Sequence, residues 1–323
     1  MMKSSKVNEA YAELGRIARG PIDDAAIIKI RKAIMGPVSF IVAQAIEVVS
    51  ENSLHELVPE MITAFARFVE DGAKVDKGCR AKTAIAKCLN QFEYIGDEVF
   101  LIGAYHIQME PAFGPPEDTA VELRSISASA IARINHVEAH YILADLLADQ
   151  EAGVRIAAIK ALAFLGTSES DVMLRLKTIV GDANDGVIGE CLLGLMKMAP
   201  TRSLEFVKRY FNGHGQVAME SAAMAVAGSH LPESLDILKE LWEDQSYLGR
   251  QALILPIALI RTDASFEYLL EILKTADRQT AIEAIPHLRL YSAEQYETRV
   301  RDAAKKRKDA RIIAKVEEEL ARD

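Results

Sequence analysis

Two histidines with a spacing suited to metal binding occur in HVEAH, residues 136 to 140. Residues four apart lie on one face of a helix, so His136 and His140 could share an ion, whereas Glu138 is offset to another face. The segment is not HExxH, and two ligands do not complete a site, because a third must come from a neighbouring helix. We therefore expect no metal site, and the two histidines to lie at a partly exposed helix start.

Other chemical motifs are incomplete. GDANDGVIGE, residues 181 to 190, is similar to a calcium loop, but its glycine comes one position early and Leu193 stands where the bidentate Glu is required. The sequence has no GxGxxG, Walker loop or GxSxG, so neither nucleotide nor acyl chemistry has a motif. We expect no enzyme and no cofactor, although a catalytic triad scattered along the chain stays open.

Composition restricts the class of protein further. Lys and Arg total 38 against 47 Asp and Glu, and the resulting net charge of −9 disfavours nucleic acid as a partner. The longest apolar run, at 252–260, is too short to span a bilayer, and the first 20 residues lack a signal-peptide core. Three cysteines, Cys79, Cys88 and Cys191, form no CxxC pair and are expected as buried free thiols. We expect a cytoplasmic protein with no membrane insertion.

A repeat of about 31 residues organises the second half of the chain. Segments with a similar small-and-aliphatic stripe begin at Leu123, Val154, Val187, Val217 and Leu248, which gives intervals of 31, 33, 30 and 31 residues. A second amphipathic segment follows each of them, so the repeating unit is a pair of helices. Such pairs bury their apolar faces only by stacking on their neighbours, which is typical of an α-solenoid.

One unit carries a family pattern. DQEAGVRIAAIKALAFLG resembles the HEAT-like, phycobilisome-lyase-type repeats, with Asp149 in the turn, Val154 and Arg155 at the start of the first helix, and Ala161 and Leu162 further on. The resemblance covers residues 120 to 290. It implies an all-α, right-handed solenoid of about eight HEAT-like helix pairs, which binds partners on its concave face.

The ends and the first third follow the repeat more loosely. Segments matching a first helix begin at Val38 and Cys79, 41 and 44 residues before the next start, so insertions are expected, one at 106–119 and the other as a polar turn at 70–78. We predict a single solenoid over 1–323, with cap helices at 1–36, repeats at 37–292 and capping helices at 293–323. The basic run at 299–311 fits a capping helix, with a basic docking patch as the alternative. The stretch from 78 to 124 resembles a subgroup of bacterial HEAT-repeat domain proteins, which implies no activity.

HEAT-like families suggest three further activities. Iron hydroxylases of this type use several His-Glu pairs, whereas this chain has only His55-Glu56. DNA glycosylases built on such arrays need a basic concave face, and no stripe of Lys and Arg forms here. Bilin lyases hold a tetrapyrrole in an apolar groove. We therefore predict a non-catalytic protein–protein interaction scaffold, and the alternative is a bilin-lyase-like or other small-molecule-handling protein.

The segment HIQMEPAFGPPEDT, residues 106 to 119, is expected to interrupt a repeat between its two helices, with an insert at 107–119. Its three prolines favour an extended backbone, and Asp118 or Thr119 is a candidate N-cap for the helix that follows. In one interpretation Met109 and Phe113 form a wedge that covers apolar helix ends. In the other, Met109, Glu110 and Phe113 overhang a groove lined by the second helices and close over an extended peptide.

Two basic residues complete the predicted partner-binding set. Lys208 and Arg209 follow each other in a second helix, where they could contact the same partner. The partner is an unidentified protein or extended peptide, and we expect the chain itself to be a monomer.

Overall fold

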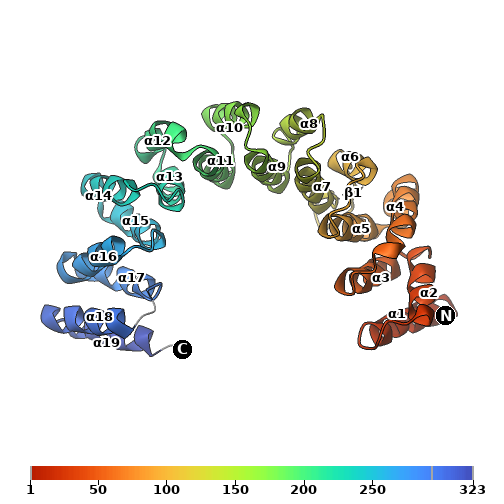
Figure 1. Ribbon diagram of the computed structural model, residues 1–323, viewed down its shortest axis with the longest axis horizontal. Helices are drawn as coiled ribbons and strands as arrows, with labels where there is room; N and C mark the ends of the chain where they lie inside the picture. Colours follow the sequence, from red (N-terminus) through yellow and green to blue (C-terminus); the bar gives the residue numbers. More distant parts are fainter. Residues whose placement is uncertain (1, 292–293, 322–323) are drawn as a thin grey trace. The chain divides into compact units, whose positions relative to one another are not determined.

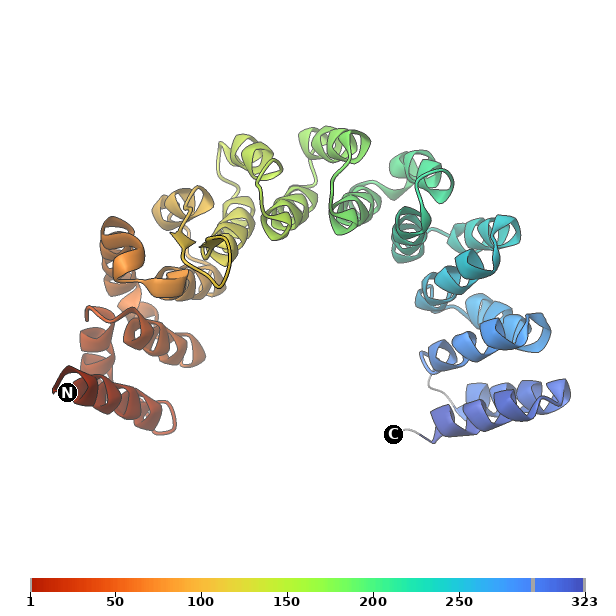
Figure 2. The same ribbon diagram turned by 180° about the vertical axis from the view of Figure 1, so that it is seen from behind.

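The computed structural model describes residues 2–291 and 294–321. It divides the chain into two compact units, Met1–Leu165 and Gly166–Asp323, each of which is described by itself. Both units are built from consecutive antiparallel helix pairs (Figures 1 and 2). The expectation of one continuous solenoid with cap helices at its ends therefore stays a prediction, whereas the all-α solenoid architecture is confirmed.

The first unit places its odd-numbered helices in one layer, since α1 packs on α3, α3 on α5, α5 on α7 and α7 on α9. The even-numbered helices form the second layer (Figure 1). Its elements are α1 (Met2–Ile17), α2 (Asp24–Ile34), α3 (Ser39–Glu51), η1 (His55–Leu57), α4 (Val58–Asp71), η2 (Gly72–Lys74), η3 (Lys77–Cys79), α5 (Arg80–Gln91), α6 (Glu98–Ala104), β1 (Met109–Glu110), β2 (Glu117–Asp118), α7 (Val121–Arg133), α8 (Ala139–Leu146) and α9 (Ala152–Leu165).

The second unit repeats the same two-layer arrangement, with α11, α13, α15, α17 and α19 stacked in order. Its elements are α10 (Ser168–Val180), α11 (Asp185–Met198), α12 (Pro200–Lys208), η4 (Arg209–Phe211), α13 (Gln216–Gly228), α14 (Ser234–Asp244), α15 (Tyr247–Leu259), α16 (Asp263–Thr275), α17 (Arg278–Leu288), α18 (Glu294–Arg307) and α19 (Ala310–Leu320). The five segments expected as first helices are α7, α9, α11, α13 and α15, and each begins within two residues of its predicted start.

Local sequence explains where several of these helices begin. The Asp277 carboxylate accepts hydrogen bonds from the backbone N–H of Gln279 and Thr280 and so caps α17. Thr262 and Ser265 form a capping box at the start of α16. Pro256 and Pro286 lie inside α15 and α17, as the pattern predicts, although each lacks the N–H that an interior position normally donates.

The insert departs from the helical pattern as a short hairpin. β1 and β2 pair antiparallel, with Met109 opposite Asp118 and Glu110 opposite Glu117. They are the only strands among the described residues. The hairpin lies between α6, the second helix of one pair, and α7, the first helix of the next, so the expectation that it separates two helices of one pair is wrong. The described residues contain no helix that is both long and apolar enough to cross a bilayer.

Candidate functional site

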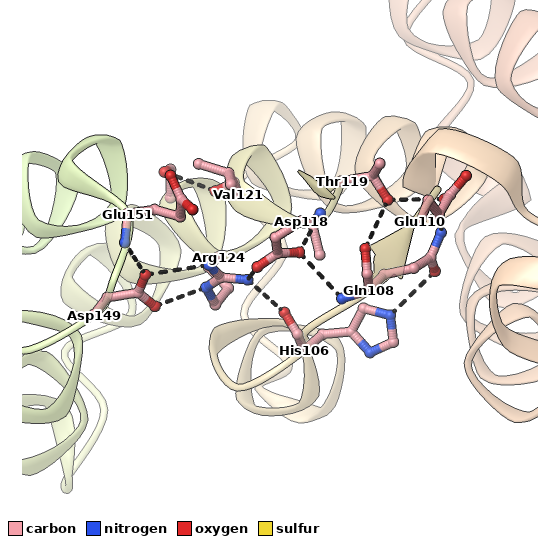
Figure 3. A network of polar contacts seen from close by, with 11 residues as sticks. His106, Gln108, Glu110, Asp118, Thr119, Val121, Arg124, Asp149 and Glu151 are labelled. Atoms are coloured by element: carbon pink, nitrogen blue, oxygen red, sulfur yellow. Dashed lines mark hydrogen bonds and ion pairs between the residues drawn. The ribbon is translucent and has the colours of Figure 1, made fainter. Parts of the chain in front are cut away.

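Glu110 fastens the base of the hairpin (Figure 3). Its Oε1 accepts three hydrogen bonds, from the backbone N–H of Gly78 at 2.7 Å, from Gln108 Nε2 at 2.6 Å and from Thr119 Oγ1 at 2.9 Å. Burial alone would raise the pKa of Glu110, but these donors hold it below its usual value. The carboxylate therefore joins both hairpin strands to the α4–α5 connection, and its proposed contact with a partner competes with this structural role.

A buried ion pair lies directly beneath that base. Lys82 and Asp76 are both fully buried, with 3.2 Å between Lys82 Nζ and Asp76 Oδ2. The ammonium also donates to the backbone oxygen of Phe68 at 3.2 Å and to Gln108 Oε1 at 2.8 Å. All three N–H groups of Lys82 are thus satisfied, which a buried charge requires.

Gln108 connects this ion pair to the hairpin. Its side chain is nearly buried, and its Nε2 donates to the backbone oxygen of Asp76 at 2.7 Å as well as to Glu110. Its backbone oxygen accepts from the N–H of Thr119 at 2.9 Å. The α4–α5 connection expected as a plain polar turn at 70–78 is therefore part of the hairpin's support, because Asp76 points inward.

Arg124 supports the hairpin from the other side (Figure 3). Its guanidinium donates to Asp118 at 2.7 Å, to the backbone oxygen of His106 at 2.9 Å, and to both carboxylate oxygens of Asp149 at 2.8 and 3.2 Å. These bonds tie α7 to the hairpin and to the α8–α9 turn. Charge-assisted bonds of this kind, screened from water, hold their partners in a fixed geometry.

Asp118 also organises the start of α7. Its Oδ1 accepts from the backbone N–H of Gln108 at 3.1 Å and of Ala120 at 2.9 Å. Burial raises its pKa, but these two N–H groups and Arg124 together lower it below the usual value. The N-cap residue of α7 is Ala120, which makes no side-chain cap, so the prediction of Asp118 or Thr119 as N-cap is wrong by one or two residues.

The tip of the hairpin points away from the protein. Phe113 is fully exposed, with a relative accessibility of 113%, and Met109 on β1 is 54% exposed. Gly114, which follows Phe113, has a φ of +152°, a backbone conformation that favours glycine. Neither apolar side chain covers a helix end, so the wedge interpretation is wrong. The prolines do not hold the whole insert as one extended segment, because its two strands turn back and pair with each other.

Two hollows flank the hairpin base within the first unit. One, of about 820 Å³, is lined by Ile107, Met109 and Pro116 together with acidic residues of the hairpin and of the α8–α9 turn, among them Glu117 and Glu151. The other, of about 490 Å³, lies on the exposed side of α3 and α5 and reaches Thr119. The hollow of about 490 Å³ is therefore lined mainly by first helices, whereas the hollow of about 820 Å³ is lined by the hairpin, Arg124 and the α8–α9 turn.

The remaining predicted partner-binding residues lie in the second unit. Lys208 ends α12, where its Nζ is 3.2 Å from Glu205 Oε1, and Arg209 begins η4 with its guanidinium over the ring of Phe206 at 5.5 Å. The structure thus brings Met109, Glu110 and Phe113 together in one hairpin and places Lys208 and Arg209 elsewhere in the fold.

The histidines make local contacts. His136 lies before α8, with its Nε2 3.3 Å from Asp97 Oδ2 and its Nδ1 accepting from the N–H of Glu138. His55 stacks on Phe92 with 4.1 Å between ring centroids. No group of three His, Cys, Asp or Glu side chains suited to a metal ion occurs within the part of the chain that the structure describes. In 181–190, Asn184 caps α11, as expected for a connection between helices.

All three cysteines are buried free thiols, as predicted. Burial raises the pKa of Cys79 to about 11 and the pKa of Cys88 and Cys191 to about 12. The thiols are therefore protonated at neutral pH and are poor nucleophiles.

Comparisons with known proteins give distant likenesses only. No family model matches the sequence, and no curated protein matches it. Among solved structures, an engineered protein is similar with a TM-score of 0.42 at 15% identity, over 97% of this chain and 93% of the other. The complex of CpcE and CpcF of phycocyanin lyase from a Nostoc species has a TM-score of 0.37 at 14% identity, over 70% of this chain and 89% of the other. At these values neither likeness identifies a partner or an activity for this chain.

Four residues of the hairpin's support were not predicted as site residues: Asp76, Lys82, Gln108 and Arg124. Lys82 gives the clearest signal in the sequence, because it lies three and four positions before Ile85 and Ala86 on the buried stripe of α5. A lysine at such a position needs a buried acceptor. The sequence could thus have indicated a buried ion pair, although not its partner.

Proposed function

We propose that the chain is a non-catalytic protein-interaction scaffold of the HEAT-like type, acting in the cytoplasm, and that the hairpin at 106–119 is its principal contact element. The observation that carries this proposal is an exposed Phe113 on a hairpin whose base is fixed by buried polar bonds. A large aromatic side chain gains on the order of 1.5 to 3 kcal/mol when it moves from water into an apolar pocket. Because Phe113 is exposed in the free protein, this gain in free energy can come only from binding a partner.

Rigidity of the base strengthens this proposal. Aromatic side chains that anchor protein interfaces lose little conformational entropy on binding when their backbone is already ordered. Glu110, Gln108 and Asp118 order the two strands, whereas Met109 and Phe113 remain available. The partner is a protein or an extended peptide that receives Phe113 or passes beneath the hairpin.

A variant test follows directly. Phe113→Ala should leave the melting temperature unchanged, because the ring buries no surface in the free protein, and should weaken capture of the protein recovered with the wild-type chain from a lysate. The matched control is Phe164→Ala on α9, whose ring is also exposed but lies outside the hairpin. Equal capture by both variants and the wild type contradicts the proposal for the hairpin.

A second candidate function is small-molecule handling, as in bilin lyases, and one observation favours it. The groove on α3 and α5 has a volume of about 490 Å³, within the range of ligand sites. Cys88 lines it, but its raised pKa disfavours covalent attachment through a thiolate. Visible absorbance of the purified protein, or of the protein after incubation with a linear tetrapyrrole, would support this candidate, and an unchanged spectrum would oppose it.

A further inference from the structure

We infer that the outer face of α6 and α8 is a docking surface for a cationic amphipathic segment, one with apolar side chains on one side and Lys or Arg on the other. This inference rests on the proposed role in protein binding and names the chemistry of the partner. It concerns a surface beside the hairpin, which the hairpin proposal does not require.

Exposed apolar side chains follow both helices. On α6 and the residues after it, Ile102, Tyr105 and Ile107 are 44%, 53% and 65% exposed. Val137, on the turn before α8, is 88% exposed, and Tyr141, in the first turn of α8, is 77% exposed. A group of this size on the outside of a soluble fold marks an interaction surface more often than a chance exposure.

Side-chain bonds join the two helices into one surface, called here the acidic outer face. Tyr105 Oη, at the end of α6, donates to Asp145 Oδ2 on α8 at 2.8 Å. At the other end, His136 Nε2 lies 3.3 Å from Asp97 Oδ2. Ile107 continues the face into the hollow beside the hairpin, where Glu117 and Glu151 also lie. Figure 1 shows α6 and α8 in the same layer, with α7 beneath them.

The charge of this face is mainly negative. Between Cys88 and Leu123 the chain has no Lys or Arg, and none occurs between Ile134 and Val154. Arg124, on α7 between these two stretches, is buried in its ion pairs, and Arg133 donates to Asn90 and to the backbone of Tyr94. Arg155, at the start of α9, donates to the backbone oxygens of Asp149 and Gln150, so one cation lies at the α8–α9 turn. Away from that turn, the carboxylates that accompany the apolar side chains have no Lys or Arg in their own stretches of the chain: Asp97, Glu98, Glu117, Glu138 and Asp145.

The negative charge of this face indicates a positively charged partner, and its exposed apolar side chains indicate that one side of the partner is apolar. The carboxylates around the apolar side chains form a rim that attracts Lys and Arg and so speeds association with the partner, whereas burial of Tyr141 and Val137 supplies affinity. An amphipathic helix presents a continuous apolar strip along one side, which can cover the exposed apolar side chains of α6 and of the start of α8. By contrast, the exposed strip on α10 in the second unit, with Val172 and Leu176, lies beside Arg175 and Arg202, both of which pair with the carboxylate of Asp171.

The test uses the full-length protein and three fluorescein-labelled helical peptides of equal length. One carries Leu on one face and Lys on the other, the second has Glu in place of Lys, and the third has Gln in place of Leu. Fluorescence anisotropy should show the Lys/Leu peptide binding at least about ten-fold more tightly than either of the others. Raising NaCl from about 50 to 300 mM should weaken that binding several-fold, because the rim charges are exposed.

Two double variants locate the site. Val137→Ser/Tyr141→Ser should lower affinity for the Lys/Leu peptide at least about ten-fold, since two anchoring side chains are lost. Glu98→Lys/Glu138→Lys should lower it by a similar factor and abolish most of the salt dependence. The matched control, Val172→Ser/Leu176→Ser on α10, should change it less than about two-fold. Circular dichroism melting of each variant confirms that the fold is kept.

Equal binding of the Lys/Leu and Glu/Leu peptides, or equal losses in the control and the Val137/Tyr141 variant, overturns this inference. So does a wild-type dimer in light scattering that Val137→Ser/Tyr141→Ser converts to a monomer, since the occupant would then be a second copy of the chain. Failure here leaves the Phe113→Ala test intact. If the peptides behave as expected but Phe113→Ala captures its partner normally, only the role assigned to the hairpin fails.

Discussion

Replacing Lys82 with Met should destabilise the protein and loosen the hairpin at the same time. The substitution keeps the length and apolar stem of the side chain but removes the ammonium that lies 3.2 Å from Asp76 and 2.8 Å from Gln108 Oε1. Asp76 retains the N–H groups of Ala81 and Lys82, at 2.9 and 3.2 Å, but loses its only counter-charge while remaining fully buried.

The magnitude follows from that burial. Removing one partner of a buried ion pair costs about 3 to 5 kcal/mol, because the remaining charge is left uncompensated in a low-dielectric interior. An exposed pair would give roughly 0 to 1 kcal/mol. The double variant Lys82→Met/Asp76→Asn removes both charges and should therefore lose less free energy of unfolding than the sum of the two single variants.

Urea unfolding followed by far-UV circular dichroism measures the effect. A loss of 3 to 5 kcal/mol in unfolding free energy should lower the urea concentration at the midpoint of unfolding by more than about 1 M. Lys87→Met is the matched control, because Lys87 lies on the exposed face of the same helix, and it should shift stability by less than about 0.5 kcal/mol. If Lys82→Met and Lys87→Met unfold at the same midpoint, the buried ion pair does not contribute to the stability of the fold.

Three further outcomes are expected. The pKa of Asp118 lies below its usual value in the folded protein, so its contribution to stability is present above about pH 4 and is lost as the pH falls through the folded pKa. The difference in unfolding free energy between the wild type and Asp118→Asn should therefore shrink over that pH range. A difference that stays constant with pH would refute this role of Asp118. Deleting 295–323 should lower the melting temperature or cause aggregation. The reason is that Val300, Ile312 and Val316 are buried in the final helices, and removing these helices exposes the apolar end of the stack. A truncated protein that stays monomeric and melts at the same temperature would contradict the proposed cap. EDTA should leave helicity and melting unchanged, and stoichiometric zinc or iron in the purified protein would promote His136 and His140 as ligands.

The helix pairs could be predicted from the sequence because their signal is periodic. The stripe that begins at Leu123 recurs four times at nearly constant intervals, and the turns between helices carry Gly, Asn and Asp where caps are needed. Stacking of equivalent helices then follows from the need to bury each stripe. The prolines at 256 and 286 did not mislead, since they fall inside helices that packing stabilises.

The hairpin could not be predicted because its structure depends on contacts distant in sequence. Glu110 meets Gly78, and Gln108 meets Lys82, across about 26 to 32 residues, so no local pattern reports them. Apolar and polar residues alternate only over residues 107–110, and the strands are two residues long, so the strand signal is too short to predict a hairpin. The sequence left open whether Phe113 folds inward as a wedge or faces a partner, whereas in the structure its ring is fully exposed.

The central claim, that the hairpin contacts a partner, is tested most directly by site-specific crosslinking. A photoreactive benzoyl-phenylalanine is placed at position 113 and, in a separate variant, at position 164 on α9, where the natural Phe164 is exposed to 63%. Irradiation in the presence of the captured partner should give a crosslinked product from position 113 and little from position 164. A product from position 164 without one from position 113 would contradict the claim.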